Sequence, residues 1–183
     1  MAAAPGSLRP YVLSAGLSVL AATLLVGALL RPFRVAGRSM APTLRDGSVV
    51  LVDRTAFLWR APRRGEVVVF RTPQWGLAVK RVVGLPGDRV VFSDGGIAVN
   101  GRPVFPSASL PDRRQERAVT VPPGTFFCVG DNLPESLDSR RIGPVSGDLL
   151  VGRVVATGAA PVITGSLAPA AAGGFPSFTG REP

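Results

Sequence analysis

Between residues 34 and 155, short apolar runs alternate with glycine and proline, and no long amphipathic helix is visible. Runs of four to seven residues with this punctuation are typical of antiparallel β-strands, so the pattern predicts an all-β domain over residues 31–155. Ser93-Asp94-Gly95-Gly96 supplies the residues of a tight hairpin turn. The polar, proline-containing segment 103–123 is predicted to be a loop or an edge excursion. The predicted strands are 48–52, 66–70, 77–83, 89–92, 96–100, 125–129 and 149–155.

A second feature precedes this domain: residues 11–30 contain no charged side chain and are rich in Leu, Val and Ala. A helix of about twenty residues spans the roughly 30 Å hydrocarbon core of a bilayer. The segment, after a short N-terminal segment 1–10, is therefore predicted to be a transmembrane anchor. A cleaved signal peptide is the alternative, although its apolar region is usually shorter, at about 7–15 residues.

The arginines around the predicted anchor bear on its orientation. Arg31, Arg34, Arg38 and Arg45 follow the apolar segment, whereas only Arg9 and the amino terminus precede it. Read by itself, the positive-inside rule places the domain in the cytoplasm.

The C-terminal segment 156–183 is rich in Ala, Gly, Pro and Ser and has few charges. This composition predicts a flexible tail. A weak second membrane segment is the alternative, but Pro161, Pro169 and several glycines interrupt any helix there.

The formal charge of +9 and the pI near 11.5 raise the possibility of a nucleic-acid-binding protein. The basic residues are scattered, however, and no run is longer than a pair such as Arg113-Arg114 or Arg140-Arg141. A solvated basic face is the better interpretation, and no nucleic-acid partner is predicted.

The sequence contains no histidine and one cysteine. Without an imidazole, a Ser-His-Asp triad, a Cys-His dyad and a histidine-ligated zinc site are excluded. One cysteine cannot form an internal disulfide or a cysteine-based metal cluster. Cys128 lies in the apolar run 126–129 and is predicted to be a small buried hydrophobic residue. No metal and no cofactor are predicted.

Lys80 is the single lysine among 21 basic residues. A leftover surface lysine is one interpretation. On a strand, however, Lys80 shares its face with the small apolar residues Ala78 and Val82. To act as a base near pH 8, its pKa must fall from about 10.4, at a cost of about 3–4 kcal/mol. Burial supplies such a shift, and the positive charge of Arg81 would act in the same direction. In a chain without histidine, a desolvated lysine is the obvious base for a serine.

Four blocks of the sequence carry a family resemblance. They occur in the order in which bacterial type I signal peptidases have them, and the resemblance covers residues 32 to about 155. The blocks are 32–44, which contains Ser39; Arg64-Gly65-Glu66-Val67-Val68-Val69-Phe70; Lys80-Arg81-Val82-Val83-Gly84-Leu85-Pro86-Gly87-Asp88; and 130–140, which reads Gly-Asp-Asn-Leu-Pro-Glu-Ser-Leu-Asp-Ser-Arg. The chain resembles these membrane-anchored Ser-Lys proteases.

The resemblance implies a role for each matching residue. Ser39 would be the nucleophile and Lys80 its general base, while Ser136 would hydrogen-bond and orient the lysine. Asp138 and Arg140 would support the site, with a surface ion pair worth roughly 0–1 kcal/mol as the alternative.

Three positions in the matching blocks bear on the details of the site. Some family members carry a hydroxyl two positions before the nucleophile, where this chain has Gly37, so the oxyanion would depend on the Ser39 backbone N–H and other non-side-chain donors. Leu133 and Glu135 replace Arg and Asn of many members, which puts details of that loop in doubt but not the dyad.

The resemblance also implies a substrate and a location. Family members cleave signal peptides from exported preproteins after small-x-small sequences, outside the cytoplasmic membrane. Phe33, Val35 and Val79 match positions that line the pockets for small side chains, although each could equally belong to the core. Preproteins and membrane phospholipid are the expected partners, and a monomer is expected. The outward placement conflicts with the arginine count, and the position of the substrate's cleavage site favours it.

Two other functions remain as alternatives. A self-cleaving repressor-type Ser-Lys protease would require a DNA-binding module and no membrane span, the reverse of this pattern. A non-catalytic anchored β-domain that binds exported proteins or anionic lipid would be expected to have lost Ser39 or Lys80, yet the sequence has both.

Overall fold

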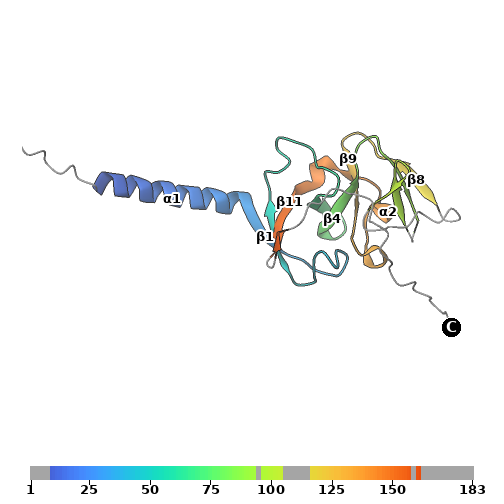
Figure 1. Cartoon of the computed structure of the whole chain (residues 1–183), viewed down its shortest axis with the longest axis horizontal. Coiled ribbons are helices and arrows are strands. Elements are labelled where there is room, and N and C mark those ends of the chain that lie inside the picture. Colours follow the sequence, from blue (N-terminus) through green and yellow to red (C-terminus); the bar gives the residue numbers. More distant parts are fainter. Residues whose placement is uncertain (1–8, 94–95, 105–115, 158–159, 162–183) are drawn as a thin grey trace, which may run out of the picture.

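The computed structural model describes residues 9–93, 96–104, 116–157 and 160–161. Helix α1 (Arg9–Leu29) projects away from a β-rich domain (Figure 1), and its apolar side chains are exposed, for example Tyr11 and Leu13 at 74% each. Most of the predicted anchor is therefore helical. A membrane span is not confirmed, because no helix within the described ranges is both long and apolar enough to cross a bilayer. Leu30, the last residue of the predicted anchor, begins the first strand.

The β-domain contains two antiparallel sheets, which confirms the predicted all-β class. The larger sheet has the order β1-β2-β11-β3-β4-β9-β10, with β12 paired to β11. Its strands are β1 (Leu30–Arg34), β2 (Val49–Asp53), β3 (Val67–Thr72), β4 (Gly76–Gly84), β9 (Thr125–Val129), β10 (Val145–Ser146), β11 (Leu150–Thr157) and β12 (Ala160–Pro161).

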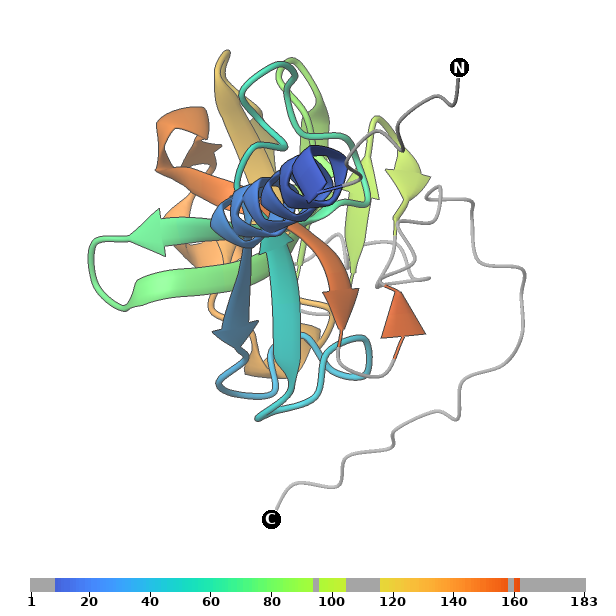
Figure 2. The same cartoon turned by 90° about the vertical axis from the view of Figure 1, so that its left-hand side faces the viewer.

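The smaller sheet follows β4 in the chain and returns to the larger sheet through β9. Its order is β7-β6-β5-β8, formed by β5 (Arg89–Phe92), β6 (Ile97–Val99), β7 (Arg102–Pro103) and β8 (Arg117–Thr120). Short helical turns connect β9 to β11: η1 (Leu133–Glu135), α2 (Ser139–Ile142) and η2 (Gly147–Leu149). Figure 2 views the domain along α1.

All seven predicted strands are present, as β2, β3, β4, β5, β6, β9 and β11. Five further strands were not predicted: β1, β7, β8, β10 and β12. β1 contains Pro32 and two arginines and lies at the edge of its sheet, where proline is tolerated. β7 and β8 lie partly or wholly in the predicted loop 103–123, and β8 is an edge strand paired only with β5 within the described chain.

Two predicted boundaries also change or remain open. Residues 156–157 and 160–161 form strand, so the predicted tail begins later than expected, and its remaining residues lie outside the described ranges. Phe92 pairs with Ile97 as the hairpin turn requires, although residues 94–95 of that turn are also outside them.

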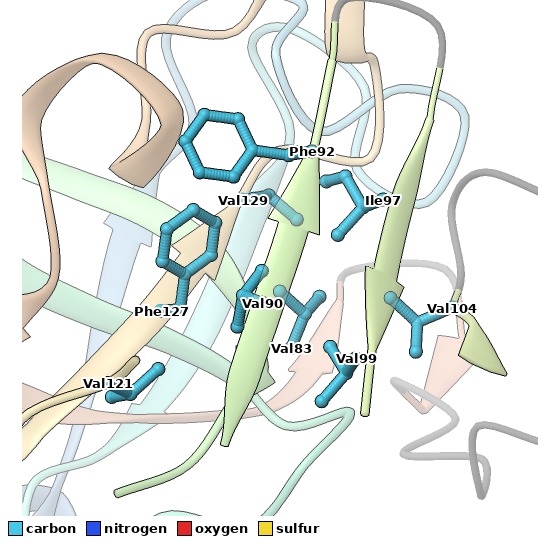
Figure 3. Close-up of a cluster of buried hydrophobic side chains, with 9 residues drawn as sticks. All are labelled: Val83, Val90, Phe92, Ile97, Val99, Val104, Val121, Phe127 and Val129. Atoms are coloured by element: carbon cyan, nitrogen blue, oxygen red, sulfur yellow. The ribbon is translucent and has the colours of Figure 1, made fainter. Parts of the chain in front are cut away.

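Three buried apolar clusters hold the sheets together. One of them joins the two sheets through Phe92 and Phe127, whose ring centroids are 5.3 Å apart (Figure 3). Strand β3 separates the other two, because Val67 and Val69 enter one cluster while Val68 and Phe70 enter the other. Burial on both faces explains the unbroken apolar run of β3. Each such side chain contributes about 1.5–3 kcal/mol of hydrophobic stabilisation.

Candidate active site

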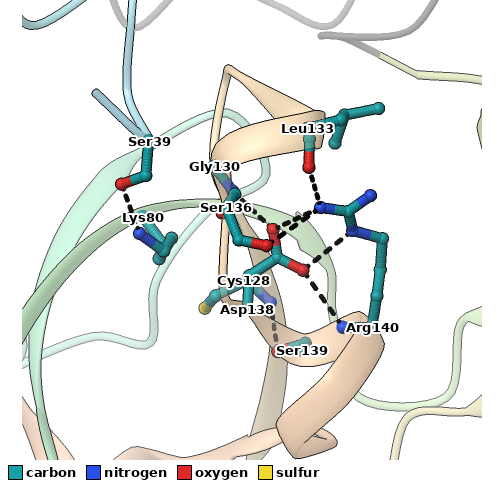
Figure 4. Close-up of polar contacts among 9 residues, drawn as sticks. All are labelled: Ser39, Lys80, Cys128, Gly130, Leu133, Ser136, Asp138, Ser139 and Arg140. Atoms are coloured by element: carbon teal, nitrogen blue, oxygen red, sulfur yellow. Dashed lines mark hydrogen bonds and ion pairs between the residues drawn. The ribbon is translucent and has the colours of Figure 1, made fainter. Parts of the chain in front are cut away.

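Ser39 and Lys80 meet although 41 residues separate them: Lys80 Nζ lies 2.6 Å from Ser39 Oγ (Figure 4). Lys80 is on β4, where it pairs opposite Val68 of the doubly buried strand β3. Ser39 lies in the turn that follows β1. The structure therefore brings together the two residues that the sequence motifs predict to be catalytic.

The turn that carries Ser39 is fixed from within. Gly37 has a φ of 88°, a left-handed conformation that favours glycine, and its N–H donates to Asp46 Oδ1 at 2.8 Å. Met40 and Leu44, which follow the serine, are almost completely buried in the cluster beneath the larger sheet. Ser39 thus lies between a hydrogen-bonded turn and two buried apolar residues.

The same turn is fixed from outside by Asn132, a residue that the sequence analysis did not select. Its backbone N–H donates to the Ser39 carbonyl at 3.0 Å, and its side-chain amide donates to the Arg38 carbonyl at 3.2 Å. These bonds join the nucleophile turn to the segment that begins with Gly130. The quoted motif contains Asn132, but its contact with a turn more than ninety residues away is visible only in three dimensions.

Lys80 is 5% exposed, so the alternative of a leftover surface lysine is wrong. Burial lowers its pKa below the ordinary lysine value, and the negative charges of Asp138 and Asp131 oppose this shift. Ala78 and Val82 belong to one apolar cluster, as the shared strand face predicts. The guanidinium of the neighbouring Arg81 forms a buried ion pair with Asp131, with N–O distances of 2.7 and 2.8 Å.

Asp138 and Arg140 form a second ion pair. The pair is buried, so it is not the exposed ion pair considered as the alternative role for these residues. Asp138 is fully buried and caps α2 by accepting from the Arg140 backbone N–H, and its Oδ1 also lies 2.9 Å from Arg140 Nε. Arg140 in turn donates to the Leu133 carbonyl at 2.6 Å. This pair holds a carboxylate near Lys80 and closes the loop 130–140.

Ser136 lies in the site but not in the predicted contact. Its hydroxyl accepts a hydrogen bond from the Gly130 N–H at 3.1 Å, and Asp138 accepts from the same N–H at 3.1 Å. The lysine amine makes its side-chain hydrogen bond with Ser39 instead. The expected direct bond between Ser136 and Lys80 is therefore not formed in this structure.

Gly130 is a further position that the sequence analysis did not select. A Cβ built there would overlap the Ser136 side chain, with Ser136 Cβ at 2.6 Å, and would also overlap the Ser39 carbonyl oxygen. Only glycine allows the β9 end, the nucleophile turn and Ser136 to approach so closely. Cys128, two residues earlier, is completely buried, as predicted.

The three predicted pocket residues lie in one cluster. Val35 is buried within it, and the half-buried Phe33 and Val79 pack against it. Phe33 also lines a cavity of about 540 Å³ between β1 and β4. Val35 by itself behaves as a core residue, whereas Phe33 and Val79 combine packing with partial exposure.

Comparison with known proteins gives a consistent result. The family described as "Signal peptidase, peptidase S26" matches residues 8–158. Signal peptidase I V of Bacillus subtilis (strain 168) is 30% identical over 163 residues, covering 79% of this chain and 95% of that protein. Signal peptidase IB of Staphylococcus aureus (strain COL) is 32% identical over 146 residues, covering 69% and 76%.

A solved structure is also similar. The crystal structure of a signal peptidase I from Enterococcus faecalis V583 is 27% identical, covers 52% of this chain and 97% of that chain, and superposes with a TM-score of 0.43. The family resemblance predicted from the four motif blocks is confirmed by the family match and the sequence relatives. The chain belongs to the signal peptidase family, peptidase S26, and is a serine peptidase of the signal peptidase I type.

Proposed function

We propose that this chain cleaves signal peptides from exported preproteins with Ser39 as nucleophile and Lys80 as general base. The observation that carries the proposal is the 2.6 Å distance between Ser39 Oγ and the buried Lys80 Nζ. A neutral amine at this distance is positioned to accept the hydroxyl proton. The lowered pKa of Lys80 keeps more of the amine neutral at a given pH.

The reaction then has two halves. Lys80 takes the Ser39 proton as Oγ attacks the scissile carbonyl, and the protonated amine gives a proton to the leaving amine. Water, deprotonated by Lys80, then attacks the resulting ester, and the protonated amine returns the proton to Ser39 Oγ as the carboxylic acid product leaves. The developing oxyanion is bound by the Ser39 backbone N–H. Gly37 offers no side chain, and its N–H is already bonded to Asp46, so it supplies no second donor.

Substrate selection in this proposal depends on the partly exposed Phe33 and Val79, which pack against the cluster that contains the buried Val35. These medium-sized apolar side chains leave room for small residues and exclude large ones at the first and third positions before the cut. Cleavage after Ala-x-Ala is the expected specificity.

Membrane attachment in this proposal depends on α1. Its described apolar side chains, such as Tyr11, Leu13 and Leu17, are exposed, and a lipid surface is the environment that suits them. The domain lies on the extracytoplasmic side, where the cleavage site emerges, and acts as a monomer beside membrane phospholipid. Carbonate extraction of membranes tests attachment, and proteolysis in spheroplasts tests the side. Full protection of the domain would contradict its outward placement.

The decisive experiment for the chemistry compares preprotein cleavage by the wild type, Lys80→Met and Ser39→Ala. Both variants are expected to lose activity by at least about a thousand-fold. Arg141→Met is a suitable control, because it removes an exposed positive side chain from the same part of the domain. Circular dichroism verifies that the variants fold. Undiminished cleavage by Lys80→Met would contradict the mechanism. If the wild type cleaves no Ala-x-Ala peptide, a non-catalytic binding protein is favoured.

A further inference from the structure

A second cavity, of about 550 Å³, lies between the smaller sheet and the segment that contains α2. It shares no lining residue with the cavity beside Phe33, so the two are separate. Strand β8 forms one wall, and α2 with the residues after it forms the opposite wall. The lining residues are Phe92, Arg117, Ala118, Val119, Phe127, Ser139, Arg140, Arg141, Gly143 and Pro144.

The cavity borders the free edge of β8. Arg117, Ala118 and Val119 follow one another in this strand, and successive side chains of a strand point to opposite faces of the sheet. Because all three line the same cavity, the cavity lies along the edge of the strand and not over one face. The other edge of β8 is paired with β5, so the edge at the cavity has no partner strand among the described residues.

Backbone groups of β8 are available at this edge. The hydrogen bond from the Val121 N–H to the Asp88 carbonyl, at 2.9 Å, sets the alternation of bonds along the β5–β8 ladder. In this alternation the N–H and C=O of Ala118 face away from β5, whereas those of its two neighbours face β5. Ala118 is also exposed. It therefore offers one donor and one acceptor to the cavity.

Three arginines make the cavity basic, and its lining contains no carboxylate. Arg117 pairs opposite Phe92, so both side chains lie on the same face of the sheet. Arg117 and Arg141 are exposed, and neither forms an ion pair with a residue that the structure describes. The side chain of Arg140 is only 11% exposed, and its Nε and Nη2 bond to Asp138. Its Nη1 has no partner in the described part of the chain and points away from Asp138 (Figure 4).

We infer that this cavity binds an extended, acidic segment of a partner protein, which adds to β8 as a further strand. The segment exchanges backbone hydrogen bonds with Ala118, and its carboxylates pair with the three arginines. A small anion would satisfy the arginines but would leave the backbone groups of Ala118 unused, so an extended peptide fits the cavity better. The site is apart from Ser39 and Lys80 and does not depend on the proposed peptidase chemistry.

The test uses the full-length chain in neutral detergent and an amidated, rhodamine-labelled peptide of sequence Val-Asp-Val-Asp-Val. This alternation places both carboxylates on one face of the extended peptide. Fluorescence anisotropy should show binding that is about ten-fold tighter than that of the matched Val-Asn-Val-Asn-Val peptide. Equal binding of the two peptides would overturn the inference. Equally effective displacement by a trinucleotide of the same charge would assign the cavity to phosphate and would also overturn it.

A matched pair of double variants separates the site from net charge. Arg117→Gln/Arg141→Gln is expected to weaken binding of the Asp peptide roughly ten-fold, about three-fold for each exposed arginine. Arg89→Gln/Arg102→Gln removes the same charge from exposed positions of the smaller sheet outside the cavity lining, and should retain the affinity. Equal losses in the two double variants would overturn the inference.

Ala118→Pro tests strand addition. Proline removes the N–H that faces the cavity, and edge strands tolerate proline, so binding should weaken about ten-fold in a folded protein. Ala118→Val keeps the N–H and should bind normally, and thermal unfolding verifies both folds. Two Asp peptides that are N-methylated at adjacent residues test the same contact on the unaltered protein. One of these two should lose binding, because alternate N–H groups of a strand face the same neighbour. Unchanged binding of both methylated peptides would overturn strand addition.

A competition experiment separates this cavity from the substrate cleft. The unlabelled Asp peptide should leave the KM for a water-soluble Ala-x-Ala peptide unchanged. A competitive rise in KM would assign the Asp peptide to the substrate cleft and overturn the inference. Anisotropy requires no turnover, so inactivity of the wild type would contradict the proposed function while the binding test still applies.

Discussion

The backbone N–H of Asn132 donates a hydrogen bond to the carbonyl oxygen of Ser39, with an N–O distance of 3.0 Å. The nucleophile turn is therefore tied to the loop that also carries Ser136, Asp138 and Arg140. A neutral hydrogen bond of this kind contributes about 0.5–1.5 kcal/mol. Its main role here is to fix the backbone of Ser39, whose side chain must reach Lys80.

Asn132→Asp is expected to lower kcat by roughly ten-fold, because a carboxylate cannot donate to the Arg38 carbonyl and would repel it. Peptide cleavage kinetics measure the effect, with little change in KM expected. Glu135→Gln is the control from the same loop, since its only described ion pair, with Arg38, is exposed and 3.8 Å long. An equal fall in kcat for both variants would mean that the loop is merely sensitive to charge.

Gly130→Ala is expected to abolish activity and to destabilise the domain by about 1–3 kcal/mol, because its Cβ would overlap Ser136 and the Ser39 carbonyl. Thermal unfolding and peptide cleavage measure the two effects. Gly16→Ala adds a methyl group where nothing lies within 4 Å and should leave activity unchanged. Normal activity of Gly130→Ala would show that the site tolerates a wider spacing.

Stability should depend on pH through Lys80 in a predictable direction. The native pKa is lowered, so the unfolded state binds the proton more tightly and stability rises as pH increases from the native pKa to the unfolded value of about 10.4. Lys80→Met removes the free-energy cost of burying the charged amine. The variant should be more stable than the wild type, by a margin that is largest below the native pKa and shrinks toward pH 10.4.

Thermal unfolding of the two proteins across this pH range measures that margin, since other titrations cancel in the difference. A margin that is constant with pH would contradict a lowered native pKa for Lys80.

Asp138→Asn is expected to change the pH–rate profile and the stability together. Asp138 raises the pKa of Lys80 against the effect of burial, so its loss should move the acidic limb of kcat/KM to lower pH. It also leaves Arg140 without its buried partner, a change that typically costs about 3–5 kcal/mol. An unshifted acidic limb in a folded variant would contradict the electrostatic coupling.

The sequence allowed prediction of β2, β3, β4, β5, β6, β9 and β11 and of the face of β4 that carries Lys80, because these depend on short apolar runs bounded by turn residues. Pairing Lys80 with Ser39 required the order of the four motifs. The roles of Gly130 and Asn132 could not be predicted, since they depend on how closely two distant loops approach. The position of the Ser136 hydroxyl, which accepts a hydrogen bond from the Gly130 N–H, also depends on the approach of these loops and not on local pattern. β1 was not predicted, because Pro32 and two arginines interrupt the apolar pattern of this edge strand.

Because the single lysine of the chain is buried in the site, chemical modification of this lysine measures access to the site. A lysine-directed acylating reagent has one lysine side chain to modify besides the amino terminus, and that side chain is the proposed base. The rate of its modification should therefore report directly on access to the dyad. A peptide or inhibitor that occupies the site should slow labelling in proportion to its occupancy, which gives a binding measurement that does not require turnover.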